Sequence, residues 1–141
     1  MTVNNYPMLV AGLLSALAAL LHLAIIVGGA TWYRFFGAGE QMAQMAETGS
    51  VYPVVVTFAI AVVLASWALY GFSAAGLGPA LPFMKFALVA ISLIYLFRAI
   101  GGVVVHFMLA RPGDFLLYSS LICLLYASAY ILGTVQLWSK L

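Results

Sequence analysis

Residues 83–110 read FMKFALVAISLIYLFRAIGGVVVHFMLA. The stretch is apolar almost throughout, and its charged side chains are Lys85 near the start and Arg98 in the middle. The hydrocarbon core of a lipid bilayer is ~30 Å thick, and a helix of about 20 apolar residues crosses it. A helix that is apolar on all sides has to be surrounded by protein or by lipid. Residues 83–110 therefore predict a transmembrane helix.

Three further apolar runs of similar length cover residues 8–30, 53–73 and 115–139. Of the 141 residues, 67% are hydrophobic and 6% are charged, whereas a soluble domain has roughly 25% charged residues. The joins are short, so they leave no room for a separate soluble domain. The sequence predicts an all-α, polytopic membrane protein, in which residues 1–141 form a single transmembrane domain built as an antiparallel bundle of four transmembrane helices.

The joins between the runs differ in kind. Residues 39–48 place Glu40, Gln44 and Glu47 on one side of a helix and two methionines on another, and an amphipathic helix of this kind lies along the membrane surface. We therefore expect a short interfacial helix at residues 39–48, in the first loop. Residues 111–114 read Arg-Pro-Gly-Asp, which is typical of a tight turn. This turn would make the last two helices a hairpin.

Polar side chains within the four runs indicate a cavity. Helices associate in lipid through small side chains and a few shared hydrogen bonds, so polar side chains are expected to face the inside of the bundle. On the third helix Tyr95, Arg98 and His106 share an arc of ~80°. His22, on the first helix, lies at a depth similar to that of His106. The side chains that we expect to line or cover one cavity are His22, Tyr95, Arg98, His106, Glu40 and Glu47.

Arg98 is the most informative of these residues. A charge in the middle of a transmembrane helix costs at least ~2.5 kcal/mol on insertion scales, so it needs a carboxylate, a set of carbonyls, water or a ligand. One interpretation is that Arg98 anchors an anionic group, such as a lipid phosphate or carboxylate, in a cavity that accommodates a lipid-like or quinone-like molecule. The other is that Arg98 extends towards the surface and pairs with Glu40 or Glu47. The two are compatible if a ligand displaces the carboxylate.

His22 and His106 allow an alternative function. Two imidazoles at matching depth on facing helices are what bis-histidine ligation of a single b-type haem requires. Zinc or copper bound by both histidines together with Glu40 or Glu47 is a related possibility. A third interpretation is that both histidines are core residues that hydrogen-bond to neighbouring hydroxyls or carbonyls. A small anion transporter is a further alternative, because none of the four apolar runs contains the carboxylate that cation exporters use.

Several function classes are excluded or disfavoured. The net charge of +2 is too small for the phosphate contacts of a nucleic-acid-binding protein. Cys123 is the single cysteine, which rules out an intrachain disulfide and a paired-thiol relay. Ser119 and Ser120 follow His106, but no Gly-x-Ser-x-Gly elbow is present. We therefore expect a protein that is not an enzyme.

The segment WYRFFGAGEQMAQMAETGSVYP, at residues 32–53, resembles a segment of small bacterial inner-membrane proteins of unassigned function. The overall plan is similar to that of the DoxX-like group of four-helix membrane proteins. These resemblances imply a location in the bacterial inner (cytoplasmic) membrane and carry over no residue roles. The distribution of lysine and arginine over the joins favours cytoplasmic termini. The expected partners are membrane lipids, with other membrane subunits or a second copy of the chain as alternatives.

Overall fold

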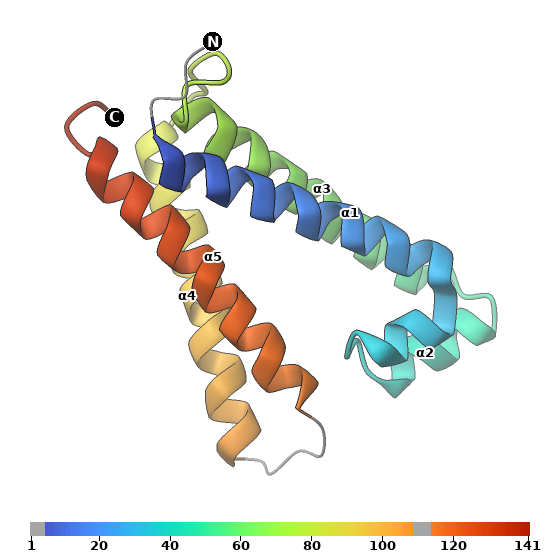
Figure 1. Ribbon diagram of the computed structural model, residues 1–141. Helices are drawn as coiled ribbons and strands as arrows, with labels where there is room; N and C mark the ends of the chain where they lie inside the picture. Colours follow the sequence, from blue (N-terminus) through green and yellow to red (C-terminus); the bar gives the residue numbers. More distant parts are fainter. Residues whose placement is uncertain (1–4, 109–113) are drawn as a thin grey trace. The chain divides into compact units, whose positions relative to one another are not determined.

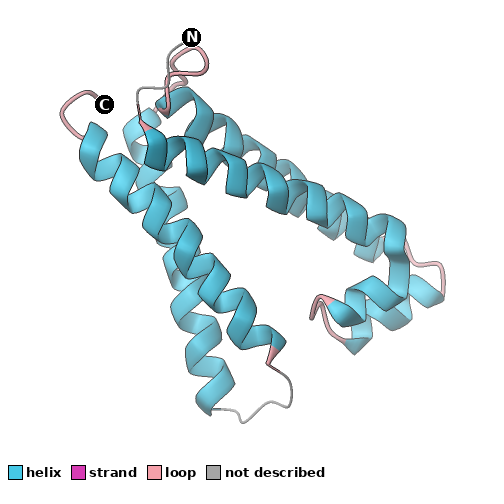
Figure 2. Cartoon of the chain, in the orientation of Figure 1, coloured by secondary structure: helices cyan, strands magenta, loops and turns pink. Residues whose placement is uncertain are grey.

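The computed structural model of the protein describes residues 5–108 and 114–141 (Figure 1). Its α-helices are α1 (Tyr6–Phe35), α2 (Glu40–Glu47), α3 (Tyr52–Ala74), α4 (Met84–Met108) and α5 (Phe115–Leu137). Within these two described ranges no residue belongs to a β-strand, and loops only connect the helices (Figure 2). The predicted all-α fold is confirmed.

Four of the helices, α1, α3, α4 and α5, are long and apolar enough to cross a membrane. The shortest have 23 residues, which at 1.5 Å per residue spans about 34 Å and exceeds the ~30 Å hydrocarbon core. Only 28% to 33% of the residues in the apolar window of each helix are buried by protein. The remaining apolar surface requires lipid as its solvent. The protein is therefore a multi-pass integral membrane protein.

The predicted boundaries agree with the structure except in α1. Helices α2 to α5 begin and end within two residues of the predicted positions in the described part of the chain. The predicted end of α4 at residue 110 and residues 111–113 of the predicted turn lie outside the described residues. The first helix was expected to end at residue 30, but α1 continues to Phe35.

Gly29 explains the difference in α1. Its backbone has φ 64° and ψ −151°, which is not helical and lies in a region that essentially only glycine adopts. A Cβ atom added at Gly29 would meet no atom within 4 Å. Gly29 therefore does not end the helix; it redirects the chain, and a second helical segment continues to Phe35.

The chain divides into two compact units. The hairpin unit consists of Met1–Ser15 and Trp67–Leu141, and the loop unit consists of Ala16–Ser66. In the hairpin unit, α4 and α5 lie side by side (Figure 1). The start of α1 meets the end of α5, because Asn5 Nδ2 donates to Gln136 Oε1 at 2.8 Å. Asn5 Oδ1 also accepts the backbone N–H of Met8 at 2.9 Å, which caps the start of α1.

The hairpin unit also contains a close approach of α1 and α3. A Cβ atom added at Gly71 would lie 2.8 Å from Gly12 Cα and 2.8 Å from Gly12 N. Two helix backbones approach this closely only where both lack side chains, and such contacts are a main source of helix association in lipid. Both glycines are buried at this contact.

In the loop unit, α2 folds back against the end of α1 (Figure 1). Ala43 of α2 is completely buried and packs with Ile25 and Tyr33 of α1. The Tyr33 hydroxyl accepts a hydrogen bond from Thr57 Oγ1 of α3 at 3.2 Å. The polar side of α2, predicted from its spacing, is exposed in the structure: Glu40, Gln44 and Glu47.

Candidate functional site

Arg98 lies on α4 and its guanidinium contacts α5. Nη1 donates to Ser120 Oγ at 3.2 Å, and Nη2 donates to Ser119 Oγ at 3.1 Å. Both contacts lie within the hairpin unit and join two helices that are neighbours in sequence. The predicted importance of Arg98 rested on its depth alone; the structure adds that two neutral hydroxyl groups hold its head group.

The two serine hydroxyls act only as acceptors towards Arg98. Ser119 Oγ donates to the carbonyl of Leu116 at 3.1 Å, and Ser120 Oγ donates to the same carbonyl at 2.6 Å. A hydroxyl has one proton, so neither serine has a proton left for a further acceptor. A guanidinium has five N–H donors, of which these two contacts use two. Within residues 5–108 and 114–141, no hydrogen bond uses the remaining three N–H groups of Arg98.

Gly102 sets the direction in which the Arg98 side chain runs. A Cβ atom added at Gly102 would overlap Ser120 Oγ and would lie 2.6 Å from Arg98 Nη1. The guanidinium thus lies beside the α4 backbone one turn beyond Arg98, where the missing side chain leaves room. Its acceptors are the fifth and sixth residues of α5, about 6–8 Å from the start of that helix. Arg98 extends from the middle of α4 towards the membrane surface, as long basic side chains do.

The charge of Arg98 has no ionic partner in residues 5–108 and 114–141. The salt bridges of this part of the chain are those that Arg34 makes with Glu40 and Glu47, at 2.7 Å and 2.6 Å. The glutamates expected to pair with Arg98 are thus held by a different arginine. Arg98 itself is exposed, and its hydrogen-bond acceptors are neutral.

The contacts of Arg34 define a charged cluster in the loop unit. Arg34 binds Glu40 through two nitrogens, with Nε donating at 2.9 Å and Nη2 at 2.7 Å, and Nη1 donates to Glu47 at 2.6 Å. These hydrogen bonds lower the pKa of the Glu40 and Glu47 carboxyl groups below the usual value. The cluster ties both ends of α2 to the end of α1. Both glutamates are therefore engaged within the loop unit by Arg34.

Tyr95 belongs to a buried hydrogen-bond chain and not to a free cavity wall. Its hydroxyl lies 3.0 Å from Ser15 Oγ, which lies 3.0 Å from the Tyr130 hydroxyl. Tyr130 donates to the carbonyl of Trp67 at 2.8 Å. Since Tyr130 uses its proton there, Ser15 donates to Tyr130 and Tyr95 donates to Ser15. The chain joins α1, α3, α4 and α5 in the hairpin unit and ends at a backbone carbonyl.

His22 lies in the loop unit and His106 in the hairpin unit. His22 Nδ1 donates to the Ala18 carbonyl at 2.7 Å, which leaves Nε2 as its free lone pair. His106 Nδ1 is buried without a partner among the described residues, so a ligand would reach only Nε2 of that ring. No group of three His, Cys, Asp or Glu side chains in the described ranges is placed to hold a metal ion. No contact among the described residues therefore supports a haem or a metal ion bound by His22 and His106.

Two features of the site were missed from the sequence. The pairing of Arg34 with the loop glutamates has a sequence signal, because Glu40 follows Arg34 by only six residues. The sequence signal for the serine partners of Arg98 is weaker: it consists of two adjacent hydroxyl side chains, Ser119 and Ser120, near the start of α5.

In comparisons with protein-family models, with curated proteins and with solved structures, nothing matches this chain.

Proposed function

We propose that this protein is a non-enzymatic membrane protein that binds the anionic head group of a lipid-like molecule at Arg98. The group would be a phosphate or a carboxylate, held by the three N–H groups that the serines leave free. The proposal includes a location in the bacterial cytoplasmic membrane with both termini in the cytoplasm, which the resemblance and the distribution of basic residues support.

The uncompensated guanidinium carries the proposal. An arginine within a transmembrane helix is costly unless it is paired, and Arg98 has two neutral acceptors and no carboxylate in the described part of the chain. Its head group extends towards the depth at which lipid head groups begin. A lipid phosphate or carboxylate is the most abundant anion at that depth, and it matches the planar donors of a guanidinium.

This geometry favours a lipid-like over a quinone-like ligand. A quinone is neutral and would leave the charge of Arg98 without a counter-ion. Tyr95 was expected to line the cavity for either ligand, but in the structure its hydroxyl donates to Ser15 within the buried chain. An anionic ligand needs neither Tyr95 nor the histidines.

Native mass spectrometry of the protein in mild detergent with added phosphatidylglycerol tests the proposal. A hydrogen bond to a charged group contributes about 1.5–3 kcal/mol, so Arg98→Ala should weaken binding at this site at least tenfold and lower the number of retained lipids by one. Arg98→Lys keeps the charge but loses the planar donors, and should bind with intermediate strength.

Ser128→Ala is the matched control for the serines. Ser128 is also on α5 and donates to a backbone carbonyl in the same way, at 2.8 Å to Leu124, without contacting Arg98. The double variant Ser119→Ala, Ser120→Ala should lose lipid, because the guanidinium loses both of its anchors, while Ser128→Ala should behave as the wild type. Equal lipid retention by wild type and Arg98→Ala would show that the proposal is wrong.

A further inference from the structure

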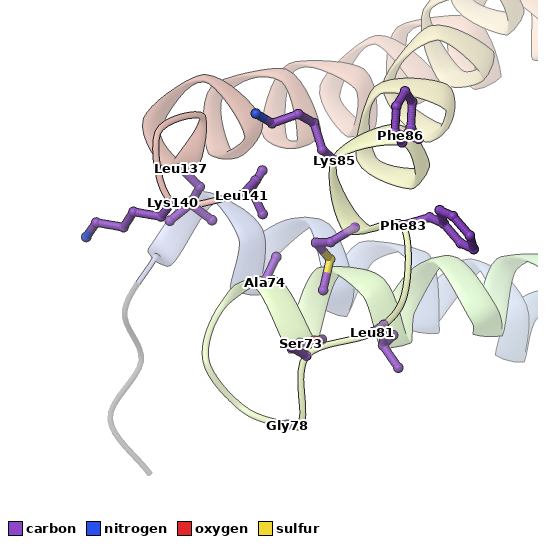
Figure 3. A pocket seen from close by; sticks show the side chains of 12 residues that line it. Ser73, Ala74, Gly78, Leu81, Phe83, Lys85, Phe86, Leu137, Lys140 and Leu141 are labelled. Carbon is purple, nitrogen blue, oxygen red and sulfur yellow. The ribbon is translucent and has the colours of Figure 1, made fainter.

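An open groove lies at the other end of the α4–α5 hairpin from Arg98. It is formed by the α3–α4 loop, the start of α4 and the end of α5, with a volume of about 600 Å³ (Figure 3). All of its lining residues belong to the hairpin unit. The groove therefore shares no residue with the Arg98 site.

The loop that forms one wall of the groove is held in place by two hydrogen bonds from α3. The Tyr70 hydroxyl donates to the carbonyl of Pro82 at 3.1 Å. Ser73 Oγ donates to the carbonyl of Pro79 at 2.6 Å. These contacts lie at both ends of the Pro79–Pro82 segment, so the wall is preorganised and does not have to order when a ligand binds.

Phe83 forms an exposed apolar edge at the start of α4. Its φ angle is 53°, a left-handed conformation that is unfavourable for a bulky residue. Its side chain is 79% exposed, and that of Phe86 is 76% exposed. Strain of this kind persists where the surrounding structure requires it and often marks a binding site. Here it presents an aromatic ring beside the groove.

Two lysines provide the charge of the groove. Lys85 Nζ lies 4.4 Å from the centre of the Trp138 ring, a cation–π contact that fixes its position. Lys140 also lines the groove. In the view of Figure 3 both amino groups lie to the left of Phe83 and Phe86, that of Lys140 further out and pointing away from the rings. Residues 73–86 and 137–141 contain no Asp or Glu, so the side chains of this region are either neutral or positive.

We propose that this groove binds one acidic glycerophospholipid, with its phosphate at Lys85 and Lys140 and an acyl chain along Phe83 and Phe86. The charge favours an anion, and the adjoining aromatic edge favours a molecule that is apolar beyond its head group. An acidic phospholipid has both properties. This site is independent of the one proposed at Arg98 and would bind lipid at the opposite end of the hairpin.

The experiment uses Trp138 as a reporter of the groove. A form of the full chain with Trp32→Phe and Trp67→Phe keeps Trp138 as its only tryptophan. It is placed in vesicles that contain phosphatidylglycerol or phosphatidylcholine with brominated acyl chains, which quench tryptophan fluorescence on contact. Each lysine near a membrane surface changes the binding of an anionic lipid roughly fivefold. Wild-type lysines should therefore give a preference for phosphatidylglycerol of about thirtyfold, and Lys85→Gln with Lys140→Gln should abolish it.

Two control variants separate this proposal from the previous one. Phe86→Ala should weaken quenching by both lipids and leave their ratio unchanged, and Arg98→Gln should leave the ratio at Trp138 unchanged. Equal quenching by the two lipids, or a preference that survives the double lysine substitution, would overturn the groove site while leaving the Arg98 site intact. A Trp138 signal that responds to an acidic peptide and shows no lipid preference would also overturn it.

Discussion

Replacing Gly29 with alanine is expected to destabilise the protein through the backbone alone. Gly29, six residues before the end of α1 at Phe35, has φ 64° and ψ −151°, and a Cβ atom there would meet nothing within 4 Å. No clash would therefore contribute to the effect. A non-glycine residue held in this region costs of order 1–3 kcal/mol, and we expect Gly29→Ala to lower the free energy of unfolding by that amount.

Gly101 provides a matched control on α4. A Cβ atom at Gly101 would also meet nothing within 4 Å, but Gly101 lies within a regular helix. Alanine is favoured over glycine in a helix by roughly 0.5–1 kcal/mol, so Gly101→Ala should be neutral or slightly stabilising. Both variants are compared with the wild type by reversible unfolding in mixed micelles, followed by circular dichroism.

Comparing the two variants shows whether Gly29 adopts the conformation described above. If Gly29→Ala unfolds at the same denaturant fraction as Gly101→Ala, then Gly29 does not adopt the left-handed conformation. In that case α1 would be a continuous helix, and the turn that brings Tyr33 onto Ala43 would need another cause.

The other predictions concern the buried hydrogen-bond chain, the charged cluster of the first loop and the Arg98 site. Ser15→Ala should cost about 1–2 kcal/mol in the same unfolding assay, because both tyrosine hydroxyls lose a partner, whereas the exposed Ser66→Ala should cost less than about 0.5 kcal/mol. The two loop glutamates have pKa values held below the usual carboxyl range by Arg34, so the stability they contribute is present at neutral pH and is lost as the pH falls through the lowered values; unfolding of Arg34→Gln should lack this loss. Gly102→Ala should reduce phosphatidylglycerol retention in native mass spectrometry, because its Cβ would displace Ser120 and the guanidinium, while the neighbouring Gly101→Ala should not.

The transmembrane helices and the loop helix were predictable because their signals are local. A long run of apolar residues predicts a membrane-spanning helix without knowledge of the rest of the chain. The spacing of Glu40, Gln44 and Glu47 likewise places them on one side of a helix whatever surrounds it. The end of α1 was not predictable, because a glycine pair does not show whether a helix stops or turns and continues. Only the backbone angles of Gly29 separate these cases.

The partners of the polar side chains depend on how the helices are rotated. Depth along a helix follows from counting residues, so the position of Arg98 near the middle of α4 was predictable. Whether that partner is a glutamate or a serine depends on which face of α5 meets α4, and no local pattern gives this. The chain from Tyr95 through Ser15 to Tyr130 likewise requires three helices to be in register.

The most direct test of the account asks whether a lipid phosphate contacts the Arg98 guanidinium. Protein labelled with ¹⁵N in its arginine side chains is placed in phosphatidylglycerol bilayers, and dephasing of the guanidinium signals by lipid ³¹P is measured by solid-state NMR. The Arg98 signal is identified by its loss in Arg98→Lys. The account predicts strong dephasing of that signal, which weakens when Ser119 and Ser120 are both replaced by alanine. An Arg98 signal that is not dephased in a folded protein would contradict it.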